Sequence, residues 1–209
     1  MSHRDHHETL LGRKRLRLLV ALLAGSTAFL LPVKSLAFWN VEVGDTVPDR
    51  QLLTLDGSRQ SLLGHGQATV FVLCRPQHDR SLQTLRELAQ LERAFAGKPV
   101  RFVAVTPDSY DPKAVRSMMR QAGVRMEVLV DKDDALAGAL GVDTRPAVAV
   151  ADEAHHLAAY QHYLSVNMGA TLQLQIQDVL DRQRGLAGRE PSKRPSDDRA
   201  RTAVASSAR

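Results

Sequence analysis

The sequence has a single cysteine and few aromatic side chains. Its 209 residues contain one thiol, Cys74, and aromatic residues make up only 4% of the chain. One cysteine cannot form an internal disulfide, which leaves a free thiol or an intermolecular disulfide in an oxidising compartment. Scarce aromatic residues remove the stacking platforms of single-strand nucleic-acid binders. Because the sequence also lacks a glycine-rich phosphate loop and the spacing of a metal site, we expect no cofactor and no metal.

The distribution of charge along the chain bears on whether the protein binds nucleic acid. The whole chain carries a formal net charge of +5. Residues 1–37 hold six Lys and Arg against two acidic residues, and residues 184–209 hold seven against three. Each end thus contributes +4, and subtracting +8 from +5 leaves −3 for residues 38–183. A mildly acidic central part excludes nucleic acid as the expected partner.

Residues 1–37 have the pattern of a secretory signal peptide. A basic stretch at 13–17 precedes a mostly apolar run of 14 residues, 18–31, which is too short to cross a hydrocarbon core of about 30 Å comfortably. Small residues before the end of this segment predict cleavage after Ala37 and a periplasmic or secreted protein. The alternative is an uncleaved membrane anchor, because the aromatic residues that follow Ala37 extend the apolar character.

The opposite end, 184–209, contains hardly any large apolar residues. Such a segment cannot bury enough surface to offset the entropy of ordering it, which predicts a disordered basic tail. Its positive charge is compatible with peripheral contact to anionic lipid. Between the two ends, residues 38–183 have the size of one domain with one core.

Within 38–183, apolar runs of strand type alternate with stripes of helical spacing. The strands are predicted at 52–55, 58–63, 69–74, 100–105, 126–130, 147–151 and 157–163. The first two form a hairpin around Asp56-Gly57. A helix starting at Asp111-Pro112 and ending at Gly123 has the expected N-cap, N1 proline and C-terminal glycine. This alternation predicts an α/β sandwich with a mixed central sheet and helices on both faces.

Several short motifs occur in a familiar order: Val43–Asp49 as a Gly-x-x-x-Pro-Asp opening, Leu53–Gly57, Leu140–Val142, and the pair Arg145-Pro146. In this set the chain resembles the redoxin branch of the thioredoxin-like superfamily, which includes thiol-specific antioxidant (AhpC/TSA-like) proteins and secreted thiol–disulfide oxidoreductases. The resemblance implies a thioredoxin-like sandwich with an N-terminal β-hairpin extension. It also implies that Arg145-Pro146 stands at the family's cis-proline loop.

The turn after the strand 69–74 departs from this family. Redox-active members carry Cys-x-x-Cys where a helix N-terminus stabilises a thiolate. Here the turn reads Arg75-Pro76-Gln77-His78. With Pro76 on the family's proline, Arg75 and His78 take the cysteine positions; a shift of one residue puts Pro76 in the place of the nucleophile. The peroxide-reducing pattern fails as well, because Arg80 and Gln83 stand where its Thr and Cys are required.

Two interpretations of Cys74 follow. In the first it is a catalytic thiol whose pKa the charge of Arg75 lowers, with His78 as a base. In the second it ends a buried strand as an inert, small apolar side chain. The position of Cys74 before the turn, rather than on the helix terminus, favours the second.

We therefore expect a degenerate active site that has lost dithiol chemistry and serves as a binding or accessory module, with a protein or peptide partner at the former active-site face. The turn is expected to face Arg145-Pro146, where two arginines favour an anionic ligand or a partner carboxylate; the alternative is a solvated rim of charges. The competing function is a monothiol oxidoreductase or peroxidase-type antioxidant enzyme acting through Cys74.

Overall fold

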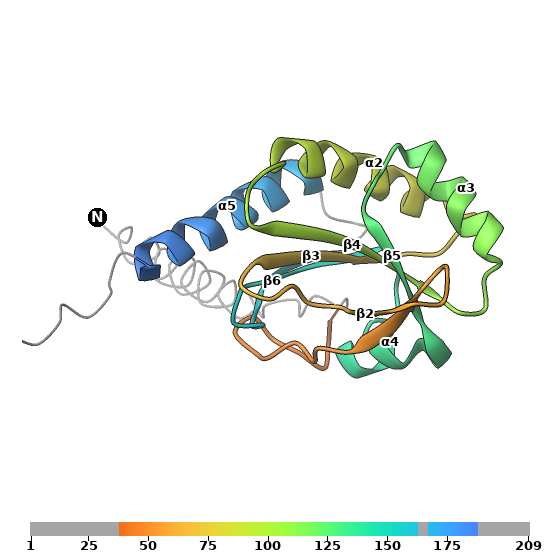
Figure 1. Cartoon of the computed structure of the whole chain (residues 1–209), viewed down its shortest axis with the longest axis horizontal. Coiled ribbons are helices and arrows are strands. Elements are labelled where there is room, and N and C mark those ends of the chain that lie inside the picture. Colours follow the sequence, from red (N-terminus) through yellow and green to blue (C-terminus); the bar gives the residue numbers. More distant parts are fainter. Residues whose placement is uncertain (1–37, 163–166, 188–209) are drawn as a thin grey trace, which may run out of the picture. The chain divides into compact units, whose positions relative to one another are not determined.

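The computed structural model describes residues 38–162 and 167–187 (Figure 1). Its elements are β1 (Gln51–Thr54), β2 (Arg59–Ser61), β3 (Ala68–Leu73), α2 (Asp79–Ala94), β4 (Val100–Pro107), α3 (Pro112–Ala122), β5 (Glu127–Asp131), η1 (Lys132–Asp134), α4 (Ala135–Leu140), β6 (Ala147–Ala151), β7 (Leu157–His162) and α5 (Met168–Ala187). The predicted signal peptide, its cleavage after Ala37, and most of the predicted basic tail lie outside the described residues. No helix within the described ranges is long and apolar enough to cross a membrane.

One seven-stranded sheet forms the centre of the domain, in the order β2-β1-β5-β4-β3-β6-β7. Strands β3, β4 and β5 run parallel, whereas β1, β2, β6 and β7 pair antiparallel. Every residue of β3 is buried, as expected of a central strand covered on both faces. The mixed sheet and the hairpin of β1 and β2 at its edge confirm the predicted fold.

Helices cover both faces of this sheet. Figure 1 shows α2, α3 and α5 on one side and the short α4 on the other. Even-numbered residues of β3 such as Val72 belong to the core under α2, α3 and α5, while odd-numbered ones such as Phe71 pack with α4 and the segment starting at Phe38. This alternation follows from the two-residue period of a strand.

Local sequence accounts for most helix boundaries. The carboxylate of Asp111 accepts a hydrogen bond from the Lys113 amide at 2.9 Å, and α3 ends at Gly123 with φ of 70°. The start of the predicted tail at residue 184 is wrong, because α5 continues to Ala187. The expected domain boundary at 183 therefore falls inside a helix.

Strand order brings two connections together at one edge of the sheet. Strand β6 runs antiparallel to β3, with Ala147 opposite Leu73. The residues that follow β3 therefore lie beside the residues that precede β6. We call residues 74–78 the β3–α2 turn and residues 141–146 the cis-proline loop, since the Arg145–Pro146 peptide bond is cis.

Candidate functional site

The first residue of the β3–α2 turn, Cys74, continues the hydrogen bonding of the sheet, and the chain leaves the sheet after it. The Cys74 amide donates to the Val105 carbonyl at 2.9 Å, and the Arg75 amide donates to Ser81 Oγ at 3.2 Å. Gln77 has φ of 62°, a left-handed conformation uncommon for its residue type. His78 is the N-cap of α2 but makes no side-chain capping hydrogen bond.

Cys74 is a core residue. It is 1% exposed, and its thiol donates only to the Val105 carbonyl, with Sγ and O 3.7 Å apart. Burial raises the pKa of the Cys74 thiol from 9.0 to about 12, and the charge of Arg145 opposes this shift only in part. The activating cation expected from sequence, Arg75, has an exposed side chain and is not the charge that acts on the thiol. Near neutral pH the sulfur is therefore a protonated thiol with little nucleophilic character.

The cis-proline loop contributes one deeply placed cation. The side chain of Arg145 is 3% exposed, whereas that of its partner Asp134 is 46% exposed. The guanidinium donates to both carboxylate oxygens of Asp134, with Nη2–Oδ1 at 2.9 Å and Nη1–Oδ2 at 3.3 Å. Such a bidentate pair fixes the plane of the guanidinium. Arg145 is therefore a positioned group at the base of the loop rather than part of a solvated rim.

The two connections enclose a cleft of about 420 Å³. Its lining residues are Arg75, His78, Arg80, Asp143, Thr144 and Arg145. The expected juxtaposition of the turn with Arg145 is thus present, and we refer to these six residues as the cationic cleft. Three candidate residues of the turn do not line it: Cys74 lies in the core beneath, Pro76 is buried, and Gln77 lines a different hollow.

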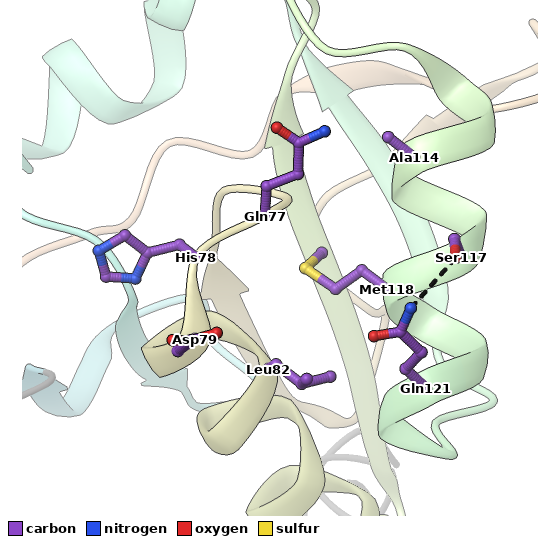
Figure 2. A pocket seen from close by; sticks show the side chains of 8 residues that line it. All are labelled: Gln77, His78, Asp79, Leu82, Ala114, Ser117, Met118 and Gln121. Carbon is purple, nitrogen blue, oxygen red and sulfur yellow. Dashed lines mark hydrogen bonds between the residues drawn. The ribbon is translucent and has the colours of Figure 1, made fainter.

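A second hollow lies on the other side of the turn, between α2 and α3 (Figure 2). Its volume is about 280 Å³, and it is lined by Gln77, His78, Asp79, Leu82, Ala114, Ser117, Met118 and Gln121. In Figure 2, Met118 extends from α3 toward the start of α2, while the ring of His78 points away from α3. Met118 is a buried residue, and its polar neighbours Ser117 and Gln121 were not singled out from the sequence. Only their helical spacing of four residues hinted that they share a face.

In the part of the chain that the structure describes, no group of three or more His, Cys, Asp or Glu side chains is arranged to hold a metal ion. The lining of the cleft presents hydrogen-bond donors from its arginines, His78 and Thr144. Guanidinium and imidazole groups bind oxyanions, while no exposed thiol is present among the described residues.

A mixed sheet flanked by helices, with a cis-proline loop facing the start of α2, defines a thioredoxin-like domain. The AhpC/TSA family model matches residues 43–160, more than half of the sequence. The chain belongs to the AhpC/TSA family. No curated protein matches the sequence.

Solved structures share this fold at low sequence identity. A Bacteroides thetaiotaomicron protein assigned as a protein disulfide isomerase has 14% identity and a TM-score of 0.63 over 73% of this chain and 98% of its own. A thioredoxin-family thiol:disulfide interchange protein from Chlorobium tepidum has 16% identity and a TM-score of 0.56 over 67% and 99%. A secreted Mycobacterium tuberculosis disulfide oxidoreductase homologous to E. coli DsbE has 17% and 0.54 over 62% and 95%. At such identities the likeness establishes the fold alone.

Proposed function

We propose that this protein is an extracytoplasmic binding module that keeps the thioredoxin-like scaffold without dithiol chemistry. The burial of its only thiol carries the proposal: the sulfur of Cys74 is enclosed, and the thiol's pKa is about 12. With Pro76 on the family's proline, Arg75 and His78 take the positions of the two cysteines, and a shift of one residue puts Pro76 in the place of the nucleophile; none of these side chains exchanges disulfides. What remains at this face is a cleft of donors beside the cis-proline loop.

The proposed partner is a protein or peptide that docks at this face. Two hollows meet at His78, so the surface is recessed on both sides of the turn. Recessed surfaces with a few placed polar groups suit ligand binding. Losing the cysteines leaves this recess in place, which is why a binding role survives the loss of redox activity.

A thiol-reactivity experiment separates this function from the alternative, a monothiol oxidoreductase or peroxidase. The purified protein is treated with iodoacetamide between pH 6 and 8, and adduct formation is followed by mass spectrometry. We expect no adduct in the folded protein and one adduct per chain in guanidinium. As a matched control, the Arg75→Cys change in a Cys74→Ala background places a thiol one residue further along, on the exposed turn, and should react within minutes.

Catalysis is tested on the same samples. Reduction of insulin by dithiothreitol and consumption of hydroperoxide should proceed at the rate of buffer alone, with wild type and Cys74→Ala indistinguishable. Turnover that disappears in Cys74→Ala would establish the monothiol enzyme instead and overturn the binding proposal.

The proposed location outside the cytoplasm rests on the basic and apolar pattern of residues 1–37, and the secreted Mycobacterium relative is compatible with it. Fractionation of expressing cells should recover the protein in the periplasm or medium, with a mature N-terminus at Phe38. Recovery in the membrane fraction with residues 1–37 intact would favour the anchored form. Retention in the membrane after cleavage would point to the basic C-terminal segment.

A further inference from the structure

The charges around the cleft are unevenly distributed. Three of its six lining residues are the arginines Arg75, Arg80 and Arg145, and the lining contains one carboxylate, Asp143. Asp134 neutralises part of the charge of Arg145 from below. Residues 38–183 nevertheless carry −3 overall. The positive charge of the cleft is therefore opposite in sign to the net charge of the domain. An anionic ligand is attracted by the side chains of the cleft and not by the net charge of the protein.

The donors in the cleft are suited to a carboxylate. A guanidinium has five N–H donors, and Asp134 engages only two donor contacts of Arg145. Because that pair holds the guanidinium in place, little ordering entropy remains to be lost when a second oxyanion binds. Arg75 extends from the exposed turn on the opposite wall, and the Thr144 hydroxyl completes the lining.

The shape of the surface indicates an extended ligand. The cleft of about 420 Å³ and the hollow of about 280 Å³ share His78. Side chains two residues apart in an extended peptide point in the same direction and lie about 6.6 Å apart along the backbone. A segment crossing the turn can therefore place an acidic side chain in the cleft and an apolar one against Met118 in the hollow.

We propose that the cationic cleft binds the carboxylate of an Asp or Glu side chain in an extended segment of the partner. This inference rests on the proposed binding function and specifies the chemistry of its partner. The two ends of this chain are poor candidates, since each carries +4 and is repelled by the arginines. Nucleic acid and anionic membranes present many charges at once and meet the net negative charge of the surrounding domain.

The test is a titration of the ¹⁵N-labelled protein with a blocked heptapeptide, Ser-Leu-Ala-Glu-Ala-Leu-Ser, followed by NMR. A second peptide replaces Glu with Gln, and inorganic phosphate is the third probe. We expect the Glu peptide to shift amide signals of residues 75–80 and 143–145, and to bind at least tenfold more tightly than the Gln peptide. Phosphate should bind more weakly than the Glu peptide.

Two charge reversals make the assignment specific. Arg75→Glu should weaken binding of the Glu peptide at least tenfold. Arg59→Glu, on the exposed edge strand β2 outside the cleft, should leave it unchanged. Circular dichroism and thermal unfolding check that both variants are folded.

The outcomes discriminate between the inference and the function on which it rests. Equal binding of the Glu and Gln peptides at the same residues overturns the carboxylate inference and leaves the binding function standing. Phosphate that matches or exceeds the Glu peptide also overturns it, because the cleft is then an inorganic anion site. If Arg75→Glu and Arg59→Glu weaken binding of the Glu peptide equally, the carboxylate inference is overturned, because the effect is then one of nonspecific charge. If neither peptide shifts signals of this face, both proposals fail.

Discussion

The cis-proline loop is fixed by buried contacts, whereas the β3–α2 turn across the cleft holds most of its polar side chains in solvent. In the loop, Arg145 is buried and paired with Asp134, and Gly141 packs directly against the segment containing Trp39. In the turn, Arg75 and His78 are exposed and His78 leaves its helix uncapped by a side chain. One wall of the cleft therefore belongs to the core and the other to the surface.

This difference separates stability from recognition. Substitutions in the loop disturb packing that the rest of the domain depends on, while those on the turn change what the cleft presents. The exposed residues of the turn can therefore be exchanged at small cost in stability. Substitutions on the two walls, and a change of pH that acts on the core, test this separation.

Gly141→Ala should destabilise the domain by about 2 to 5 kcal/mol. Gly141 has φ of +69°, and an added Cβ would lie 1.9 Å from Trp39 Cδ1 and 2.7 Å from the Asn40 amide nitrogen. Left-handed backbone costs a non-glycine residue about 1 to 2 kcal/mol, and overpacking adds about 1 to 3. Urea unfolding measures the effect. Gly138→Ala is the matched control, since nothing lies within 4 Å of its Cβ. If both variants lost the same free energy of unfolding, the packing of the loop would not be the cause.

Alkaline pH should destabilise wild type more than Cys74→Ala. The unfolded thiol titrates near 9.0 and the folded one near 12. Because the folded pKa is raised, the stabilising contribution is complete below pH 9 and is lost as pH rises from 9 to 12. The difference should reach about 3 kcal/mol at pH 11, at 1.36 kcal/mol per pKa unit. Unfolding curves at pH 8 and 11 measure it, and parallel pH dependence of the two proteins would show that Cys74 is not buried as described.

Asp134→Asn should cost about 2 kcal/mol, because it leaves the buried guanidinium of Arg145 without a counter-charge. The half-exposed position of Asp134 keeps the loss below that of a fully buried pair. Asp133→Asn is a close control: Asp133 also has positive φ, 55°, but its side chain is exposed. Chemical denaturation should place the control within about 0.5 kcal/mol of wild type. A comparable loss in the control would assign the effect to backbone conformation instead of charge.

On the turn, His78→Ser should stabilise the protein by about 1 kcal/mol. The N-cap of α2 has no side-chain hydrogen bond, and serine is among the preferred capping residues. Thermal unfolding should show a rise of about 2 to 4 °C. Arg75→Ser, on the same turn but outside the cap, should change the midpoint by less than 1 °C. A fall in the midpoint of His78→Ser would mean that the imidazole supports the turn.

Much of the fold follows from local sequence. The apolar run of β3, the Asp-Gly hairpin and the Asp111-Pro112 start of α3 all depend on neighbouring residues, and each lies where predicted. The exception is the end of α5, where small and charged residues past 183 continue the helix. A composition without large apolar residues excludes a core, but it does not exclude a helix.

The site was less accessible to sequence reasoning because its decisive contacts are distant along the chain. Whether Cys74 is reactive depends on its bond to Val105 and on the helices above it, so the sequence left two interpretations open. The partner of Arg145 lies 11 residues away, in a connection with two consecutive left-handed aspartates. No local pattern signals that an arginine at this position is buried.

The enclosure of Cys74 has a practical consequence for spectroscopy. Since the chain has no other cysteine, a nitroxide or maleimide dye will find no native target while the domain is folded. One cysteine introduced at exposed Thr144 and another at exposed Gln121 would accept spin labels in an otherwise unaltered background. Dipolar distances between the two labels, measured with and without a bound partner, would then report any change in the separation of the two sides of the turn.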